Sequence, residues 1–354
     1  MQGKKHYHAL DWMKTLAIFF VLFYHTYKVD TDFLSTGSWI AYLHYFLETP
    51  FATAVPLFFT VNGFLLLGKP LDLSRHWKRM KSLFCLTIFW DAVCCAFQLL
   101  IRHEHTTLIG FVFMVHDSEI LWFLRALFVL YVFLPLIKEV FDHNKKVFYF
   151  TLLLFMVFSF GNKTLVMLSN ILDQLLHIDA ISNNYNFFAD FNPFKGLAGY
   201  SFAYFMIGGL LSEHLEEILG RVKTGMFAAV LVSCWVLLFG YGVLVSFHTN
   251  DIYDVVYPSY GEVFTCLMTV SVFCLFSKFL SKPVPALLQS VSANTLGIYC
   301  VQWPVFAYIK LNFGHLYGVN YLLNFVVAVF VLAVCTLIVV TVRKIPIIRR
   351  MLMM

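Results

Sequence analysis

Two ionisable side chains in the first apolar segment have the spacing to act along one helix face. Lys14 and His25 lie within LDWMKTLAIFFVLFYHT (10–26), eleven residues apart. At about 100° and 1.5 Å per residue, both side chains fall on nearly the same face, about 16 Å apart. An ammonium group can hold an anionic ligand, and an imidazole can take up or carry a proton near neutral pH. Asp11, three positions before Lys14, is placed to form an ion pair with it.

This spacing allows two interpretations. In the functional one, the two side chains form a polar stripe beside a cavity, since ionisable groups inside a membrane are costly unless they are paired or hydrated. In the structural one, Lys14 extends to the lipid headgroups, and His25 is an interfacial residue with a hydrogen-bond partner.

A second polar group begins at HDSEILWFLRALFVLYVFLPL (116–136). Glu119 and Arg125 lie in the outer third of this segment, and Asp91 of the preceding segment lies at a depth where an arginine side chain can reach it. An ion pair between Asp91 and Arg125 that joins two helices is the favoured interpretation. Trp122 and Tyr131 have the character of aromatic residues at a membrane interface.

A strongly basic stretch, DLSRHWKRMKSLF (72–84), supplies Lys78, Arg79 and Lys81. Such a stretch fixes topology and attracts anionic headgroups. It could equally dock a polyanionic cytosolic cosubstrate, such as a nucleotide-bearing acyl carrier. The sequence has no Walker loop, dinucleotide fingerprint, HExxH or Gly-x-Ser-x-Gly motif, so the common phosphate-binding and hydrolase signatures are absent.

The composition requires these residues to be placed by membrane helices. Of the 354 residues, 60% are hydrophobic and only 13% are charged, about half the charged fraction of a soluble domain. This predicts an all-α, polytopic membrane bundle and excludes a free cytosolic enzyme and a disulfide-stapled secreted domain. The net charge of +5 is spread too thinly for a nucleic-acid binder. All eight cysteines lie in apolar runs and have the pattern of small buried hydrophobic residues.

Segments of about 20 mainly apolar residues predict membrane spans. No cleavable signal peptide is expected, because the first run carries Asp11 and Lys14. The outer stretch 162–195 is expected to be a loop, either a re-entrant or capping segment or a lid over an outward-facing site, and 104–116 is too short to cross. Ten spans are predicted, at 10–28, 50–68, 82–101, 119–137, 147–161, 196–213, 225–246, 260–280, 286–309 and 321–342.

The basic residues set the orientation of these spans. With the N-terminus inside, 18 of the 25 lysines and arginines fall in the inner segments. Both termini are therefore expected in the cytoplasm, and residues 1–354 are expected to form a single membrane-embedded domain.

Six blocks, taken in order over residues 11–304, resemble the acyltransferase-3 family of integral-membrane acyltransferases. Members open with Asp-x-x-Arg followed by a histidine, which resembles Asp11-Trp-Met-Lys14 and His25. The other blocks are PLFFTVNGFLL (56–66), the basic stretch KRMK (78–81), LWFL (121–124) with Tyr131 and Pro135, YFMIGG (204–209), and SANTLGIYCVQWP (292–304).

The chain departs from the family pattern at three positions. Lys14 stands where arginine is usual and keeps the charge without the bidentate fork. Asn62 replaces the usual serine, and Gln302 replaces a frequent histidine, so an acid–base role is not expected at that last position.

The resemblance implies transfer of an acyl group, commonly acetyl, from cytoplasmic acyl-CoA to a hydroxyl of a cell-envelope glycan or lipid-linked sugar in a bacterial cytoplasmic membrane. Acyl-CoA would be a cosubstrate, with no permanently bound cofactor, no metal and no attached extracytoplasmic domain. His25 would be the general base or a covalent acyl carrier, with Lys14 at the inner mouth and Glu119 orienting the imidazole. The implied substrate-binding residues are Asp11, Lys78, Arg79, Lys81, Trp122, Arg125, Tyr299 and Gln302.

Two other classes of function compete with this one. A transporter or flippase for a glycan or lipid intermediate also needs about ten helices and a buried polar track, although the inverted repeats of many transporters are not detectable here. A structural or regulatory membrane partner would leave Lys14, Asp91 and Arg125 unexplained.

Overall fold

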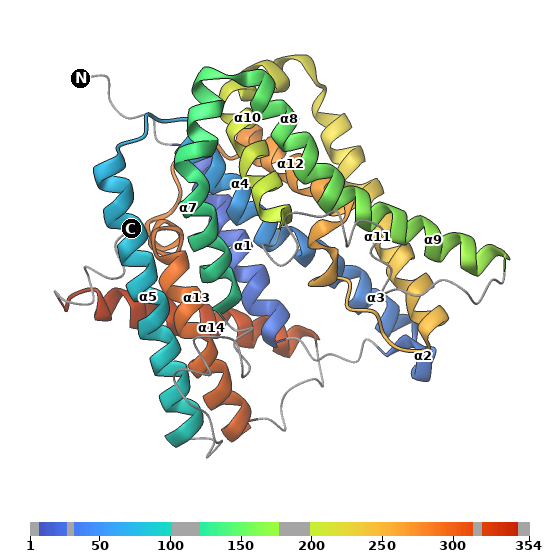
Figure 1. Ribbon diagram of the computed structural model, residues 1–354. Coiled ribbons are helices and arrows are strands. Elements are labelled where there is room, and N and C mark those ends of the chain that lie inside the picture. Colours follow the sequence, from blue (N-terminus) through green and yellow to red (C-terminus); the bar gives the residue numbers. More distant parts are fainter. Residues whose placement is uncertain (1–6, 27–31, 101–120, 177–198, 314–320, 346–354) are drawn as a thin grey trace.

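The computed structural model describes residues 7–26, 32–100, 121–176, 199–313 and 321–345, and this part of the chain is helical and contains no strand. Figure 1 shows the helices gathered into one bundle, with α9 and α11 extending to one side. The helices are α1 (His8–Thr26), α2 (Phe33–Thr36), α3 (Trp39–Glu48), α4 (Ala54–Leu67), α5 (Leu73–Leu100), α7 (Trp122–His143), α8 (Lys145–Met156), α9 (Asn162–Leu176), α10 (Gly199–Arg221), α11 (Thr224–Thr249), α12 (Val263–Phe279), α13 (Ala286–Phe313) and α14 (Tyr321–Val342).

Within the described residues, every predicted span overlaps helical structure, and five helical stretches there are both long and apolar enough to cross a membrane. The number of ten spans and the positions of the termini remain predictions. Three of the helices outside those five, α1, α7 and α13, carry Lys14, Arg125 and Gln302, and such side chains lower the hydropathy of a helix. The five stretches are Trp39–Leu67, Leu73–Leu100, Lys145–Leu176, Thr224–Thr249 and Tyr321–Val342.

The prediction of a loop from residue 162 is wrong for its first half. A π-turn at Val157–Gly161 links α8 directly to α9, so helical structure continues to Leu176. Polar residues of α9 find partners inside the bundle. Asn170 Nδ2 donates to Tyr241 Oη at 3.1 Å, and Asp173 lies 3.0 Å from His248 Nε2. Residues 177–195 and the stretch 104–116 lie outside the described part of the chain.

Helix α4 lies at the centre of the bundle and packs most extensively against α10. Two glycines allow the close approach. A Cβ atom added to Gly63 would lie against the carbonyl oxygen of Phe205, and one added to Gly208 would lie against that of Thr60. Small residues at such interfaces let helix backbones come together, as in membrane helix pairs generally. The Gly63 and Gly208-Gly209 positions of the sequence blocks are therefore explained by packing.

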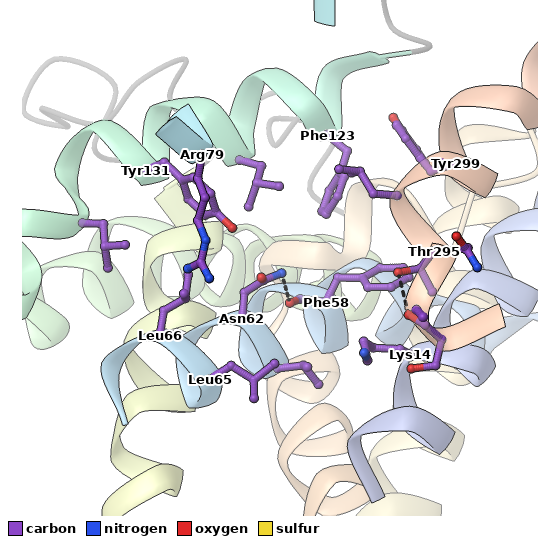
Figure 2. Close-up of a pocket in the computed structure, with 18 of the residues that line it drawn as sticks. Lys14, Phe58, Asn62, Leu65, Leu66, Arg79, Phe123, Tyr131, Thr295 and Tyr299 are labelled. Carbon is purple, nitrogen blue, oxygen red and sulfur yellow. Dashed lines mark hydrogen bonds between the residues drawn. The ribbon is translucent and has the colours of Figure 1, made fainter. Parts of the chain in front are cut away.

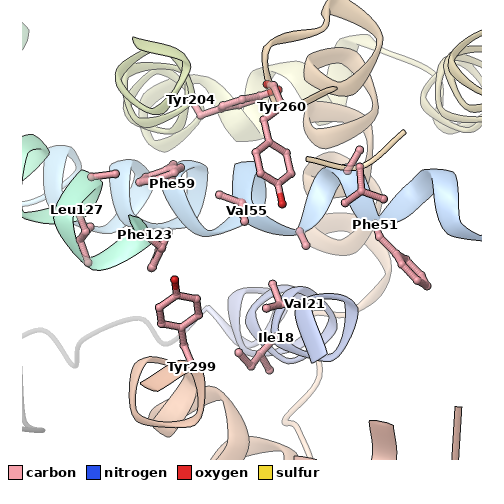
Figure 3. Packing of buried hydrophobic residues seen from close by; sticks show 14 of the residues in the cluster. Ile18, Val21, Phe51, Val55, Phe59, Phe123, Leu127, Tyr204, Tyr260 and Tyr299 are labelled. Carbon is pink, nitrogen blue, oxygen red and sulfur yellow. The ribbon is translucent and has the colours of Figure 1, made fainter. Parts of the chain in front are cut away.

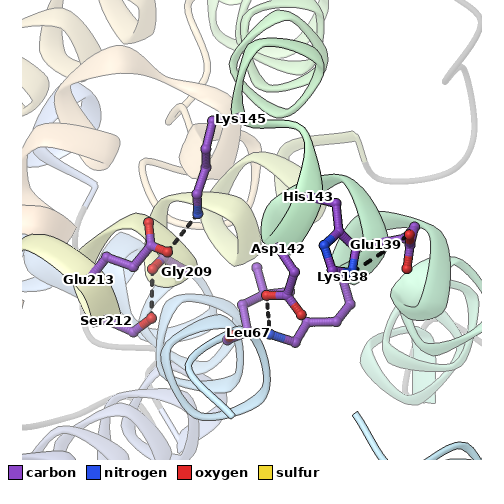
Figure 4. Close-up of polar contacts among 9 residues, drawn as sticks. All are labelled: Leu67, Lys138, Glu139, Asp142, His143, Lys145, Gly209, Ser212 and Glu213. Carbon is purple, nitrogen blue, oxygen red and sulfur yellow. Dashed lines mark hydrogen bonds and ion pairs between the residues drawn. The ribbon is translucent and has the colours of Figure 1, made fainter. Parts of the chain in front are cut away.

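Two lysines connect neighbouring helix ends (Figure 4). Lys138 is buried, donates to the carbonyl oxygen of Leu67 at 2.8 Å and pairs with Asp142. It thereby satisfies a carbonyl at the C-terminus of α4 that has no partner within its helix. Lys145 pairs with Glu213 of α10 at 2.6 Å. These contacts hold α4, α7, α8 and α10 in register below the cavity described next.

Candidate active site

A cavity of about 410 Å³ opens between α1, α4, the start of α5, α7 and α13. Its size lies within the range of small-molecule sites. Figure 2 shows Arg79 and Lys14 directed toward the hollow from opposite sides, with Asn62, Leu65 and Leu66 of α4 between them. The lining residues range from Lys14 to Arg343, which follows α14 (Tyr321–Val342), so this site exists only in the folded bundle.

The end of the cavity predicted to face the cytoplasm is basic. Lys69, Arg75 and Arg79 line it, and within the described ranges none of the three forms an ion pair. The neighbouring Asp72 accepts the backbone N–H of Arg75 at 3.1 Å and so caps α5. His76 is buried, and its Nε2 lies 2.9 Å from the carbonyl oxygen of Tyr131. The mouth therefore offers several cationic donors to an anionic ligand.

Only one of the three predicted basic residues of α5 reaches this mouth. Arg79 lines the cavity, whereas Lys78 and Lys81 are exposed and do not line it. Positions 72, 75, 76 and 79 follow the three-to-four-residue repeat of one helix face. Lys78 and Lys81 lie on another face of the helix. The basic residues that line the mouth beside Arg79 are Lys69 and Arg75.

The predicted pair at the start of α1 is confirmed. Lys14 Nζ lies 3.6 Å from Asp11 Oδ1, and the hydroxyl of Ser292 donates to the same oxygen at 2.5 Å. Asp11 is buried, while the Lys14 side chain keeps 23% of its surface and lines the cavity. This network ties α1 to α13 and fixes one ammonium group at the wall of the hollow.

The opposite end of the cavity is apolar and points along α1 toward His25. Val21, Val55, Phe123 and Tyr299 line this end. His25 follows Val21 by four residues, which places it on the same face, one turn or about 6 Å further. The His25 ring is exposed, lies 5.3 Å from the ring of Tyr24 and does not line the cavity. The predicted stripe from Lys14 to His25 therefore borders the hollow only as far as Val21.

Sequence reasoning missed a polar contact next to His25. Tyr24 donates its hydroxyl to Asp254 Oδ2 at 2.5 Å, and Asp254 Oδ1 accepts the backbone N–H of Val256 at 2.8 Å. The two partners are 230 residues apart, so no local pattern could reveal the pair. A carboxylate thus lies beside the outer end of α1, although it holds Tyr24 and not the imidazole.

Trp122 belongs to an aromatic cluster on this outer side and does not line the cavity. Its ring stacks against Tyr260 at 6.0 Å and meets Tyr257 edge-on at 6.0 Å. Figure 3 shows Tyr260 and Tyr299 approaching α4 from opposite sides, with Phe123 between α4 and Tyr299. Aromatic side chains therefore pack around α4 beside the apolar end of the cavity.

The remaining predicted residues divide into three cases. Tyr299 is buried and lines the cavity. Gln302 is buried outside its wall, and its Oε1 has no hydrogen-bond partner in the described part of the chain. Glu119 lies outside the described residues. Among the residues that are described, no group of three or more His, Cys, Asp or Glu could hold a metal ion.

Arg125 forms the predicted interhelical ion pair. Its Nη2 lies 2.9 Å from Asp91 Oδ1, joining α7 to α5, and neither residue lines the cavity. The Asp91 side chain is only 1% exposed. Because the charges are withdrawn from water, each depends on the other for compensation.

We expect Asp91→Ala to destabilise the protein by about 3–5 kcal/mol, because it leaves the Arg125 guanidinium without this carboxylate. The midpoint of thermal unfolding in detergent measures the effect. The double variant Asp91→Leu/Arg125→Leu removes both charges and should recover much of the loss. A double variant as unstable as the single one would show that the pair is not the cause.

Comparison with known families agrees with this architecture. The Acyl_transf_3 family model, described as an acyltransferase domain, matches residues 7–343, nearly the whole chain. No curated protein and no solved structure gives a significant match. The matched range contains every helix that builds the cavity, together with its basic mouth and the end of α1 that carries His25. The chain therefore belongs to the acyltransferase-3 family and is a multi-pass membrane acyltransferase.

Proposed function

We propose that the protein transfers an acyl group, such as acetyl, from cytoplasmic acyl-CoA to a hydroxyl of a cell-envelope glycan or lipid-linked sugar in a bacterial cytoplasmic membrane. The observation that carries the proposal is the cavity, which has a basic mouth and an apolar end directed along α1 toward His25. This polarity matches a donor with phosphates at one end and a thioester at the other.

The basic mouth fits the nucleotide end of the donor. Arg75 and Arg79 can form charge-assisted hydrogen bonds with phosphate oxygens, and Lys69 adds a third charge. The adenine nucleotide would stay at the mouth, where the basic side chains lie. The pantetheine arm would then pass Lys14 and Asn62 toward Val21.

We assign the transfer to His25, which lies one turn beyond Val21 on the same face of α1 and outside the wall of the cavity. The thioester would reach it by passing Val21, and the hydroxyl would approach from the far side. In the transfer, the hydroxyl oxygen attacks the thioester carbonyl carbon while the imidazole takes the hydroxyl proton. The C–S bond then breaks, and the coenzyme A thiolate receives that proton. An acyl group carried covalently on His25 would use the same position, so both routes assign the central step to this side chain.

Acyl-CoA binding is the direct test of this proposal. We expect acetyl-CoA at about 100 times its dissociation constant to stabilise the purified protein by about 2.7 kcal/mol, seen as a higher unfolding midpoint in detergent. Such protection is expected of an acyltransferase and not of a flippase for a glycan. No protection by acetyl-CoA or by coenzyme A would overturn the proposal.

Substitutions at two neighbouring basic residues test whether acetyl-CoA binds at specific side chains or to a generally basic surface. Arg79→Gln should weaken acetyl-CoA binding roughly 10- to 100-fold, the loss of about 1.5–3 kcal/mol for a hydrogen bond to a charged group. Lys78→Gln removes the same charge one residue away, where the side chain is exposed and directed elsewhere. The affinity of Lys78→Gln for acetyl-CoA should stay close to that of the wild type. Equal losses in both variants would contradict the assignment of Arg79 to the mouth.

A further inference from the structure

The apolar end of the cavity is closed by well-packed side chains. Phe123 of α7 forms its stop, with ring centroids 5.1 Å from Phe59, 5.8 Å from Phe58 and 5.4 Å from Tyr299. Phe123 is 6% exposed and Tyr299 is 8% exposed. A ring held on three sides by other rings has little freedom to move aside, because packed interiors respond to added volume with strain.

Two valines complete this end of the cavity. Val21 of α1 and Val55 of α4 line it and are both buried. One turn further outward, Phe51 is 3% exposed and Ala52 is fully buried, and neither lines the cavity. Among the described residues, the lining of the hollow therefore ends at Val21 and Val55.

We infer that Val21, Val55, Phe123 and Tyr299 select the length of the acyl group, and that they admit a short acyl thioester such as acetyl. This inference rests on the proposed function, because it assigns the acyl end of the donor to this part of the cavity. A longer chain meets the Phe123 stop, which pushes its thioester carbon back toward the mouth and away from His25. Each extra methylene group in an apolar site changes the discrimination between two ligands by roughly 10- to 200-fold.

Helix α4 offers a matched pair of substitutions. Val55 and Val61 both line the cavity and are both buried, at 5% and 2% exposure. Val55 belongs to the closed end, whereas Val61 lies six residues, or about 9 Å, further toward the mouth. Val55→Ala removes two methyl groups at the stop, and Val61→Ala removes the same groups where the pantetheine arm would pass.

The test compares dissociation constants of coenzyme A, acetyl-CoA and butyryl-CoA, measured from protection against thermal unfolding. The wild type should bind acetyl-CoA at least 10-fold more tightly than butyryl-CoA. Val55→Ala should reduce that ratio about 10-fold through tighter binding of butyryl-CoA, and Val61→Ala should leave it unchanged. Val21→Ala, on a different helix, should reduce the ratio in the same way. It replaces Val55→Ala as the test if that variant does not fold.

The outcomes separate this inference from the proposed function. If the wild type binds acetyl-CoA and neither Val55→Ala nor Val21→Ala changes the ratio, the closed end does not measure the acyl group. A wild type that already binds butyryl-CoA as tightly as acetyl-CoA would also overturn the inference while leaving acyl-CoA binding intact. If none of the three compounds binds, the proposed function itself fails.

Discussion

Replacing His25 by alanine is expected to lower acyl transfer by about 10²- to 10⁴-fold, the usual contribution of a positioned general base; loss of a covalent carrier would remove the reaction altogether. His25 forms no hydrogen bond or ion pair within the described part of the chain, and its ring is exposed. Its removal should therefore change stability by no more than about 0.5 kcal/mol. Mass spectrometry of envelope polysaccharides from cells with the wild-type or variant protein measures the product.

Two controls distinguish loss of a catalytic residue from loss of donor binding and from a general effect of removing a histidine. Acetyl-CoA should still protect His25→Ala against thermal unfolding, because the cavity ends at Val21 and the donor contacts lie on the inner side. His143→Ala removes an exposed histidine that contacts Glu139 at the end of α7 and should keep normal acylation. Normal acylation in His25→Ala would refute the catalytic role of this histidine, whatever the state of the cavity.

The local part of the site could be predicted because helix geometry is regular. Lys14 follows Asp11 by three positions, and that spacing was sufficient to predict their ion pair. The helices themselves followed from apolar length, and the Asp91–Arg125 contact followed from comparing depths in two spans. In each case the prediction needed only the repeat of one helix or the depth of two residues in the membrane.

The choice of basic residues at the mouth of the cavity was partly wrong, and the sequence contained the information to correct it. A cluster of charges shows that a segment is basic but does not show which side chains share a face. Asp72, Arg75, His76 and Arg79 follow the helical repeat that lines the mouth, whereas Lys78 and Lys81 do not. Choosing residues by helical period would have found Arg75 in place of the two lysines.

Contacts between distant segments had no such signal. Tyr24 and Asp254 meet only because α1 and the loop after α11 come together in the folded bundle. The polar residues Asn170 and Asp173 of α9 likewise find their partners, Tyr241 and His248, on another helix. The free-energy cost of burying a polar side chain in a membrane helix is offset by its tertiary partner. That partner cannot be identified from the local sequence.

The same dependence on tertiary contacts gives the largest expected effect on stability. Gly63→Ala should destabilise the protein by more than about 3 kcal/mol, because the new Cβ would overlap the carbonyl oxygen of Phe205, and backbone cannot yield as a flexible side chain can. Gly208→Ala, which meets the carbonyl of Thr60, should have a similar effect. Because α4 also lines the cavity, either variant should lose acetyl-CoA binding together with its fold.

The control for this pair lies in α11, where a Cβ added to Gly240 meets no atom within 4 Å. There the substitution only replaces glycine with a better helix former, so Gly240→Ala should be neutral or stabilising by about 0.5–1 kcal/mol. Unfolding midpoints in the same detergent compare the three variants directly. If Gly63→Ala unfolded at the wild-type temperature, the close α4–α10 contact that positions the wall of the cavity would be wrong. The cavity would then lose its structural support, while the match of the chain to its family would stand.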